Sequence, residues 1–239
     1  MKRQALDGAR RRRLYLFRHG AVDYVNPDGS WVPDPDLVSL NERGWEQARR
    51  MGEAFAGVAV DKAICSGLKR TRQTAETVLA SHAIPLTVDP GLEEIRPGTF
   101  EETAGYDPLS DVAFLHWRAS NPEARFLGGE RYSAFYSRVS EAIDAIVMDH
   151  EWHNLAIVAH GGTNAAILGW VTGLGLEAFG MFDQETCCLN IIDFDTTPDG
   201  VVRKTVRAVN VTSIDPLKSD RHAGDMELLA KSIISLADV

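Results

Sequence analysis

The sequence is poor in the residues and runs that define several classes of protein. Its 239 residues hold only three cysteines, Cys65, Cys187 and Cys188, so neither a disulfide framework nor a thiolate zinc site is indicated. No apolar run approaches the roughly eighteen residues that span a bilayer, and the amino terminus lacks the apolar core of a secretory signal. We therefore expect a cytoplasmic protein with buried, unpaired cysteines and no membrane partner.

Positive charge is also scarce. The chain has 25 Lys and Arg against 34 Asp and Glu, a formal net charge of -9, which argues against nucleic acid as a partner because phosphate backbones are bound by basic surfaces. The exception is the amino terminus, where Arg10 to Arg13 are consecutive. We expect residues 1–13 to form a solvated, disordered arm. The sequence leaves open whether the chain forms a homo-oligomer.

The chain also lacks a Pro-, Gly- or Ser-rich linker and any internal repeat, which favours one domain over residues 14–211. Apolar and polar residues alternate between strand and helix patterns along it. The strands are expected at 14–17, 62–65, 86–88, 155–159, 188–194 and 201–209, and the helices at 41–56, 68–81, 133–150 and 163–171. This order predicts an α/β three-layer sandwich with a mainly parallel central sheet, flanked by helices, whose last two strands are antiparallel or at an edge.

Two segments depart from that alternation. Residues 96–131 are irregular and aromatic, and we interpret them as an inserted excursion with some helix. Residues 212–239 form a polar tail with a short amphipathic helix over 226–236. In addition, Ser66 is expected to cap the helix that follows it, and Trp45 to lie on the apolar face of the first helix.

Chemically useful side chains follow four of the expected strands. Arg18-His19-Gly20 and His160-Gly161-Gly162 each stand where a buried strand ends, Arg70 follows the second strand, and Glu93 and Glu94 follow the third. The glycines allow backbone N–H groups to face an anion, aided by the partly positive start of the next helix. Each feature alone is ordinary, but ligands bind at the carboxyl ends of such strands, so together they indicate a phosphate site.

With these residues the chain resembles members of the histidine phosphatase superfamily, the phosphoglycerate-mutase-like family. The resemblance runs in the family's order over residues 14–194 and has six segments. These are Leu16-Phe17-Arg18-His19-Gly20, Leu40-x-x-x-Gly44-x-x-Gln47-Ala48, Ser66-x-Leu68-x-Arg70-x-x-x-Thr74-Ala75, Leu92-x-Glu94, Gly128-Gly129-Glu130 and Val158-Ala159-His160-Gly161-Gly162.

The resemblance implies a fold like that of phosphoglycerate mutase and a role for each matching residue. It implies that His19 is the nucleophile, that Arg18, Arg70 and His160 surround the phosphoryl group, and that Glu94 donates and accepts protons, because the acid stands two residues after the leucine. Glu93 is the reserve candidate. We expect a phosphomonoesterase that hydrolyses a small phosphorylated metabolite through a phosphohistidine.

The chemistry of these side chains agrees with that implication. A neutral imidazole nitrogen can attack phosphorus, and nearby cations oppose its protonation. Guanidinium groups match phosphate oxygens with forked donors, and a carboxyl group can protonate the leaving oxygen and later take a proton from water. Since these groups supply the positive field, we expect no cofactor and no metal. His150 and His153 could imitate a metal pair, but no third ligand is evident.

Three alternatives stay open. The first is phosphoryl transfer of the phosphoglycerate mutase type, which the sequence disfavours because Ala21 and Val22 replace the family's acidic and hydroxyl residues, and asparagine appears only as a shifted Asn26. The second is a protein that binds phosphorylated ligands without catalysis, and the third is a metal hydrolase. The substrate itself is not predicted, although aromatic residues could line a site for a carbon-rich body or merely form the core of the excursion; they are Trp31, Tyr106, Phe114, Trp117 and Phe126.

Overall fold

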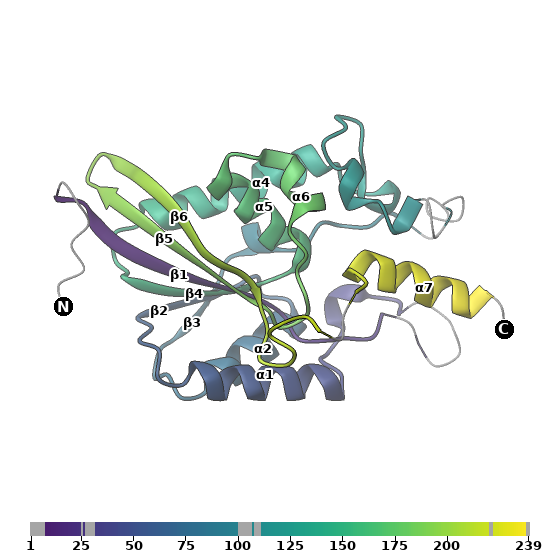
Figure 1. Cartoon of the computed structure of the whole chain (residues 1–239), viewed down its shortest axis with the longest axis horizontal. Helices are drawn as coiled ribbons and strands as arrows, with labels where there is room; N and C mark the ends of the chain where they lie inside the picture. Colours follow the sequence, from purple (N-terminus) through teal and green to yellow (C-terminus); the bar gives the residue numbers. More distant parts are fainter. Residues whose placement is uncertain are drawn as a thin grey trace.

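The computed structural model describes residues 8–24, 26, 32–99, 107, 111–219 and 222–237. Its centre is a six-stranded sheet with the order β3-β2-β4-β1-β5-β6 (Figure 1). The strands are β1 (Arg10–Arg18), β2 (Lys62–Cys65), β3 (Leu86–Val88), β4 (Asn154–Ala159), β5 (Leu189–Thr197) and β6 (Gly200–Val211). β1, β2, β3 and β4 pair in parallel, whereas β5 is antiparallel to β1 and β6 to β5. The predicted mainly parallel α/β fold with an antiparallel end is therefore confirmed.

Helices cover both faces of this sheet. α1 (Glu42–Phe55) and α2 (Lys69–Val78) lie on one side, and α4 (Tyr132–Met148), α5 (Gly161–Thr172) and the short α6 (Ala178–Met181) lie on the other (Figure 1). The predicted helices are thus present, with ends shifted by a few residues. Short 3-10 turns, at Pro35–Leu37, Pro90–Leu92 and Gly175–Glu177, connect the larger elements.

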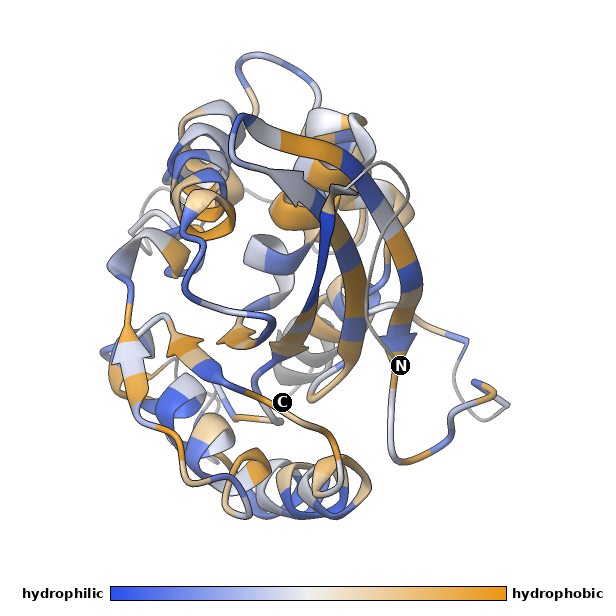
Figure 2. Cartoon of the chain, turned by 90° about the vertical axis from the view of Figure 1, so that its left-hand side faces the viewer, coloured by the Kyte–Doolittle hydropathy of each residue, from blue (hydrophilic) through white to orange (hydrophobic). Residues whose placement is uncertain are grey.

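The alternation of side chains along the strands creates two separate cores. In β1, Leu14 and Leu16 join the core under α4 and α5, while Tyr15 and Phe17 join the core above α1 and α2. Figure 2 shows the apolar residues of the strands as orange bands, interrupted by blue hydrophilic ones. Successive side chains of a strand point to opposite faces, so a run that is apolar throughout is suited to a sheet covered on both sides.

The first strand begins earlier than the sequence indicated. Residues 1–7 lie outside the described residues, but β1 starts at Arg10, so the prediction of a disordered arm is wrong for Arg10 to Arg13. Arg11 and Arg13 form ion pairs with Asp195 and Asp193 of β5, which are almost fully buried. Arg12 points to the opposite face, where its guanidinium stacks 4.4 Å from the ring centre of Trp152. Partners distant in the sequence therefore bring the basic run into the sheet.

Two local predictions are also wrong. The residue that precedes the first turn of α2 is Leu68, not Ser66, and no side chain caps that helix. Trp45 is 39% exposed because it lies outside the buried face of α1, which consists of Gly44, Gln47, Ala48, Met51 and Phe55. The side chains of Ser66 and Gln47 instead form hydrogen bonds near the strand ends, described below.

The two irregular segments contain short helices. The excursion holds turns at His116–Arg118 and Phe126–Gly128, while residues 100–106 and 108–110 lie outside the described part, as do Tyr106 and Trp31. The tail contains α7 (Asp225–Ala237), as predicted. The three cysteines are buried and free. Within the described ranges, no helix has the length and apolarity needed to cross a membrane.

Candidate active site

The parallel register brings the exits of three strands to one edge of the sheet. Arg18 lies beside Ala159, and Cys65 lies beside Val158, so β1, β2 and β4 end at the same level. The backbone N–H of His19 extends this ladder by donating to the carbonyl oxygen of Ala159 at 3.0 Å. As a result, the rings of His19 and His160 meet edge to face, with their centres 5.2 Å apart.

His19 is held with one defined ring nitrogen available. Its Nδ1 lies 2.8 Å from the carbonyl oxygen of Gly20, which can only accept, so Nδ1 carries the hydrogen and Nε2 keeps its lone pair. The residue is only 2% exposed. Burial, together with the charges of Arg70 and Arg18, lowers the pKa of His19 well below 6.5. His19 is therefore a neutral imidazole at physiological pH.

The backbone that follows His19 is fixed by α1 and α2. Thr74 Oγ1 accepts from the N–H of Gly20 at 3.0 Å, and Gln47 Oε1 accepts from the N–H of Ala21 at 2.9 Å. A side chain on Gly44 would place its Cβ 2.1 Å from the Ala21 oxygen, so only glycine allows this approach. Our sequence reasoning assigned no function to these three residues, although all stand in the matching segments.

His160 presents the opposite ring nitrogen. Thr71 donates its hydroxyl hydrogen to the carbonyl oxygen of Leu68 at 2.8 Å, so Ser66 Oγ, 2.9 Å away, donates to Thr71 Oγ1. Ser66 must then accept from His160 Nε2 at 2.8 Å. This leaves His160 Nδ1 buried and without a hydrogen-bond partner among the described residues. Burial, Arg70 and His19 lower the pKa of His160 well below 6.5.

Arg18 and Arg70 are held at one edge of their guanidinium groups and leave another atom unpaired. Arg18 Nη1 donates to the carbonyl oxygen of Gln184, and Arg70 Nη1 donates to that of Pro35 at 2.7 Å. The Nε atoms of both arginines are buried without a partner in the described part of the chain. Such donors are costly to bury unpaired, so they favour a bound anion.

Glu94 follows β3, and both of its carboxylate oxygens accept from backbone N–H groups. Its Oε2 accepts from Gly162 at 3.0 Å and its Oε1 accepts from Ile95 at 3.0 Å. A Cβ on Gly162 would lie 2.5 Å from Oε1, so this contact requires glycine. Glu93 instead points to an ion pair with Arg96 at 3.0 Å. The geometry therefore favours Glu94 over Glu93 as the acid that faces the site.

Arg138 of α4 holds the backbone that carries Glu94. Its Nη1 donates to the carbonyl oxygens of Gly91 and Glu93 at 3.1 and 3.0 Å, and Nη2 pairs with Glu130 at 3.3 Å. Glu130 is the acid of the Gly128-Gly129-Glu130 segment. Sequence reasoning missed Arg138, and only its position on the inner part of a long helix could have drawn attention to it.

Tyr24 is a further residue that the sequence did not single out. Its ring centre lies 5.8 Å from the guanidinium carbon of Arg70, a cation–π distance. Burial raises the pKa of its phenol above 10, so the hydroxyl stays protonated and can donate a hydrogen bond. Tyr24 thus adds an aromatic face and a polar group beside the two arginines.

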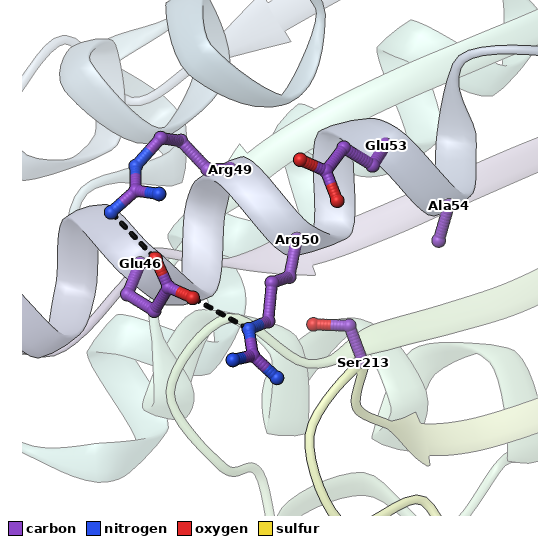
Figure 3. Close-up of a pocket in the computed structure, with 6 residues that line it drawn as sticks. All are labelled: Glu46, Arg49, Arg50, Glu53, Ala54 and Ser213. Atoms are coloured by element: carbon purple, nitrogen blue, oxygen red, sulfur yellow. Dashed lines mark hydrogen bonds and ion pairs between the residues drawn. The ribbon is translucent and has the colours of Figure 1, made fainter.

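Other candidate sites offer less. The described residues hold no group of three His, Cys, Asp or Glu side chains placed to bind a metal, and His153 Nδ1 lies 2.7 Å from Arg10 Nη2 instead. Figure 3 shows a hollow on the outer face of α1, where Glu46 pairs with Arg49 and Arg50 and where Ser213 approaches from the segment after β6. Glu46, Arg49 and Arg50 pair with one another at the surface, so we assign this hollow no role.

Comparison with known proteins defines the class of protein. The histidine phosphatase superfamily (branch 1) matches residues 14–206, and the chain belongs to that superfamily. The adenosylcobalamin/alpha-ribazole phosphatase of Escherichia coli (strain K12) is 30% identical over 188 residues, which are 77% of this chain and 90% of that protein. The chain is thus a phosphatase of this superfamily.

Solved structures agree with this assignment. The alpha-ribazole phosphatase from Shigella flexneri superposes with a TM-score of 0.67 at 27% identity, covering 83% of this chain and 96% of that one. The mycobacterial glucosyl-3-phosphoglycerate phosphatase has a TM-score of 0.68 at 24% identity, covering 84% and 99%. The second of these likenesses concerns the fold alone.

Proposed function

We propose that this protein hydrolyses a small phosphorylated metabolite through a phosphohistidine formed on His19. One observation carries the proposal. Three buried nitrogens without partners among the described residues, Arg18 Nε, Arg70 Nε and His160 Nδ1, accompany the free Nε2 of His19. A tetrahedral anion would engage all four groups: its oxygens accept from the two arginine N–H groups and from Nδ1 of a protonated His160, and its phosphorus is the electrophilic centre for His19 Nε2.

In the first step, the lone pair of His19 Nε2 attacks phosphorus, and the bond between phosphorus and the ester oxygen breaks. Protonated Glu94 gives its proton to the departing oxygen, which leaves as an alcohol. In the second step, water attacks the phosphohistidine and passes a proton to Glu94. The phosphorus–nitrogen bond then breaks, and inorganic phosphate and neutral His19 are released.

Each remaining residue has a part in these steps. Arg18 and Arg70 bind the equatorial oxygens and oppose protonation of His19. The backbone N–H of Gly161, at the start of α5, adds a donor from the partly positive end of that helix. His160 binds one phosphoryl oxygen through Nδ1 when its ring is protonated. No step requires a metal ion or a cofactor.

The relatives suggest which esters to examine first. The Escherichia coli relative is named as an adenosylcobalamin/alpha-ribazole phosphatase, and we infer that phosphate esters with a carbon-rich body suit this protein. Transfer to a second sugar acid, as in phosphoglycerate mutase, is less well supported because Ala21 and Val22 stand where the family has acidic and hydroxyl residues. A cytoplasmic location, the lack of a nucleic-acid partner and any homo-oligomer stay predictions.

Turnover and phosphoenzyme formation test the proposal together. The wild-type protein is expected to release phosphate from 4-nitrophenyl phosphate with or without EDTA and to form an acid-labile phosphoenzyme with a ³²P-labelled ester. His19→Ala removes the attacking nitrogen, so both signals should vanish while the circular dichroism spectrum is retained. His153→Ala, which changes an exposed histidine, is the matched control. Near wild-type turnover by His19→Ala would refute the proposal.

A further inference from the structure

The carboxyl-terminal helix α7 reaches the candidate active site. Figure 1 shows α7 on the side of the molecule where β1 ends. Asp225, in the first turn of this helix, forms an ion pair with Arg18. The two side chains are 23% and 15% exposed, so the pair is largely shielded from water. A residue near the end of the chain thus contacts a proposed phosphate-binding group.

The helix and the segment before it are anchored beside Arg18. Lys218 pairs with Glu185 at 2.5 Å, one residue from Gln184, whose carbonyl oxygen binds Arg18. Met226 packs against the core under α4 and α5, and Ala230 is fully buried. Several independent contacts therefore hold Asp225 in place, rather than the ion pair alone.

The contact with Asp225 leaves room for a phosphoryl group on the same arginine. Asp225 and the Gln184 oxygen both contact Nη1 of Arg18, whereas Nε stays unpaired and lies against the start of α5. A Cβ on Gly161 would be 3.3 Å from this Nε. Arg18 can thus bind a phosphoryl oxygen through Nε while Asp225 stays beside Nη1.

The charges around this position are unfavourable for a second anionic group on the substrate. Asp183 and Glu94 also act on Arg18, and Asp183 lies 3.6 Å from where a Cβ of Gly224 would be. The arginines described in and beside the excursion already have acceptors: Arg96 pairs with Glu93, Arg118 with Asp111, Arg131 with Glu123 and Arg138 with Glu130, and Arg125 donates to the Gly129 oxygen. An extra carboxylate on the substrate would therefore meet these acids, and none of the excursion arginines just named would be free to bind it.

We infer that Asp225 determines specificity, because its carboxylate disfavours phosphate esters that carry a second negative charge near the ester oxygen. The preferred substrates are phosphate esters of neutral or cationic alcohols. This inference rests on the proposed phosphatase mechanism and deepens it. A carboxylate in contact with Arg18 lies within a few ångströms of any group that Arg18 binds, a range over which like charges repel strongly in a partly buried site.

Two substrates of similar size test this inference. Glycerol 3-phosphate has a neutral hydroxymethyl group where 3-phosphoglycerate has a carboxylate, and both carry the same phosphate. Because the phosphate is the same, the effect of Asp225 on it cancels in the ratio of the two kcat/KM values. The ratio therefore reports the effect of Asp225 on the second charge. We expect the wild-type protein to favour glycerol 3-phosphate and Asp225→Asn to lower this ratio by about tenfold.

Two further variants make the result specific. Glu227→Gln removes the same charge from an exposed position of the same helix, and Asp225→Glu keeps the charge at the site. Both should hold the ratio within about twofold of the wild-type value, because both keep the negative charge at position 225. A tenfold change in the ratio corresponds to about 1.4 kcal/mol. Phosphate release from 4-nitrophenyl phosphate by each variant reports whether the chemistry itself is retained.

The possible failures can be told apart. If Asp225→Asn leaves the ratio unchanged, lowers KM equally for both esters, or matches Glu227→Gln, the inference is overturned while the proposed phosphatase function stands. If the wild-type protein does not release phosphate from 4-nitrophenyl phosphate, the proposed function fails first.

Discussion

The exits of β1 and β4 carry the same dipeptide, His-Gly, yet they present different ring nitrogens to one site. His19 donates from Nδ1 to a carbonyl oxygen, which leaves Nε2 with its lone pair. His160 is held through Nε2 by the Ser66 hydroxyl, which leaves Nδ1 unpaired in the described structure. The two histidines have the same position relative to their strands, and their hydrogen-bond partners distinguish them.

This difference separates His19, the proposed nucleophile, from His160, the group proposed to bind an oxygen. A carbonyl oxygen can only accept, so it fixes one tautomer of His19 and keeps Nε2, the proposed attacking nitrogen, unprotonated. A phosphoryl oxygen beside Nδ1 of His160 needs an N–H donor there, so a bound anion favours the protonated form of that ring. For each histidine, the hydrogen-bond partner of the ring nitrogen that does not face the anion indicates the proposed role.

The largest expected effect comes from exchanging each histidine for asparagine. His19→Asn should lower kcat by about 10⁴-fold or more and abolish the phosphoenzyme, because the covalent route is lost. His160→Asn should lower kcat by about 10² to 10³-fold, since only a charge-stabilising donor is lost, and it should still form the phosphoenzyme. Rapid-quench labelling measures both. Equal loss of labelling in the two variants would contradict the distinction.

The comparison extends to the neighbouring acids Glu93 and Glu94. Glu94→Gln should reduce kcat/KM for an alkyl phosphate by about 10² to 10³-fold, because no proton reaches the poor leaving group. The loss should be much smaller for 4-nitrophenyl phosphate, whose leaving group needs no proton. Glu93→Gln serves as the matched variant and should have little effect on either substrate. A larger loss in Glu93→Gln would move the acid role to Glu93.

The fold and the candidate site were readable from the sequence where local pattern suffices. Buried runs that end in His-Gly mark strand exits, and parallel pairing then brings distant exits to one edge. The sequence could not show which nitrogen of each histidine is free, because Ser66 reads as a helix cap until its distance to His160 is known. Likewise, Arg10 to Arg13 read as a solvated run because their partners, Asp193 and Asp195, come almost at the end of the domain. The contact of Asp225 with Arg18 is of the same kind.

A smaller effect is expected when the partner of His160 is removed. Ser66→Ala leaves Nε2 of His160 without an acceptor, so the ring can turn or change tautomer, and kcat/KM should fall by about tenfold, as for one lost buried hydrogen bond. Labelling of His19 should be retained. Ser81→Ala is a suitable control because Ser81 also faces a histidine ring, at 3.3 Å from His82 Nδ1, but in an exposed position. Wild-type activity in Ser66→Ala would show that the serine does not orient His160.

The smallest effect concerns His116, a half-buried histidine of the excursion whose Nδ1 lies 2.9 Å from the Tyr132 hydroxyl. Burial and the charge of Arg18 lower the pKa of His116 to about 4. An unfolded histidine has a pKa of about 6.5, so between these values the unfolded state binds more protons, and stability falls as the pH falls below 6.5. From pH 7.5 to 5.5 this group should cost about 1 kcal/mol of unfolding free energy, a loss that His116→Gln avoids. Urea unfolding of the wild-type protein and of His116→Gln at the two pH values measures this loss of unfolding free energy. His19 and His160 contribute equally to the loss in the two proteins, so the comparison isolates His116. Identical losses would mean that His116 is not kept neutral by its surroundings, and that burial beside Arg18 does not by itself hold a histidine uncharged in this protein.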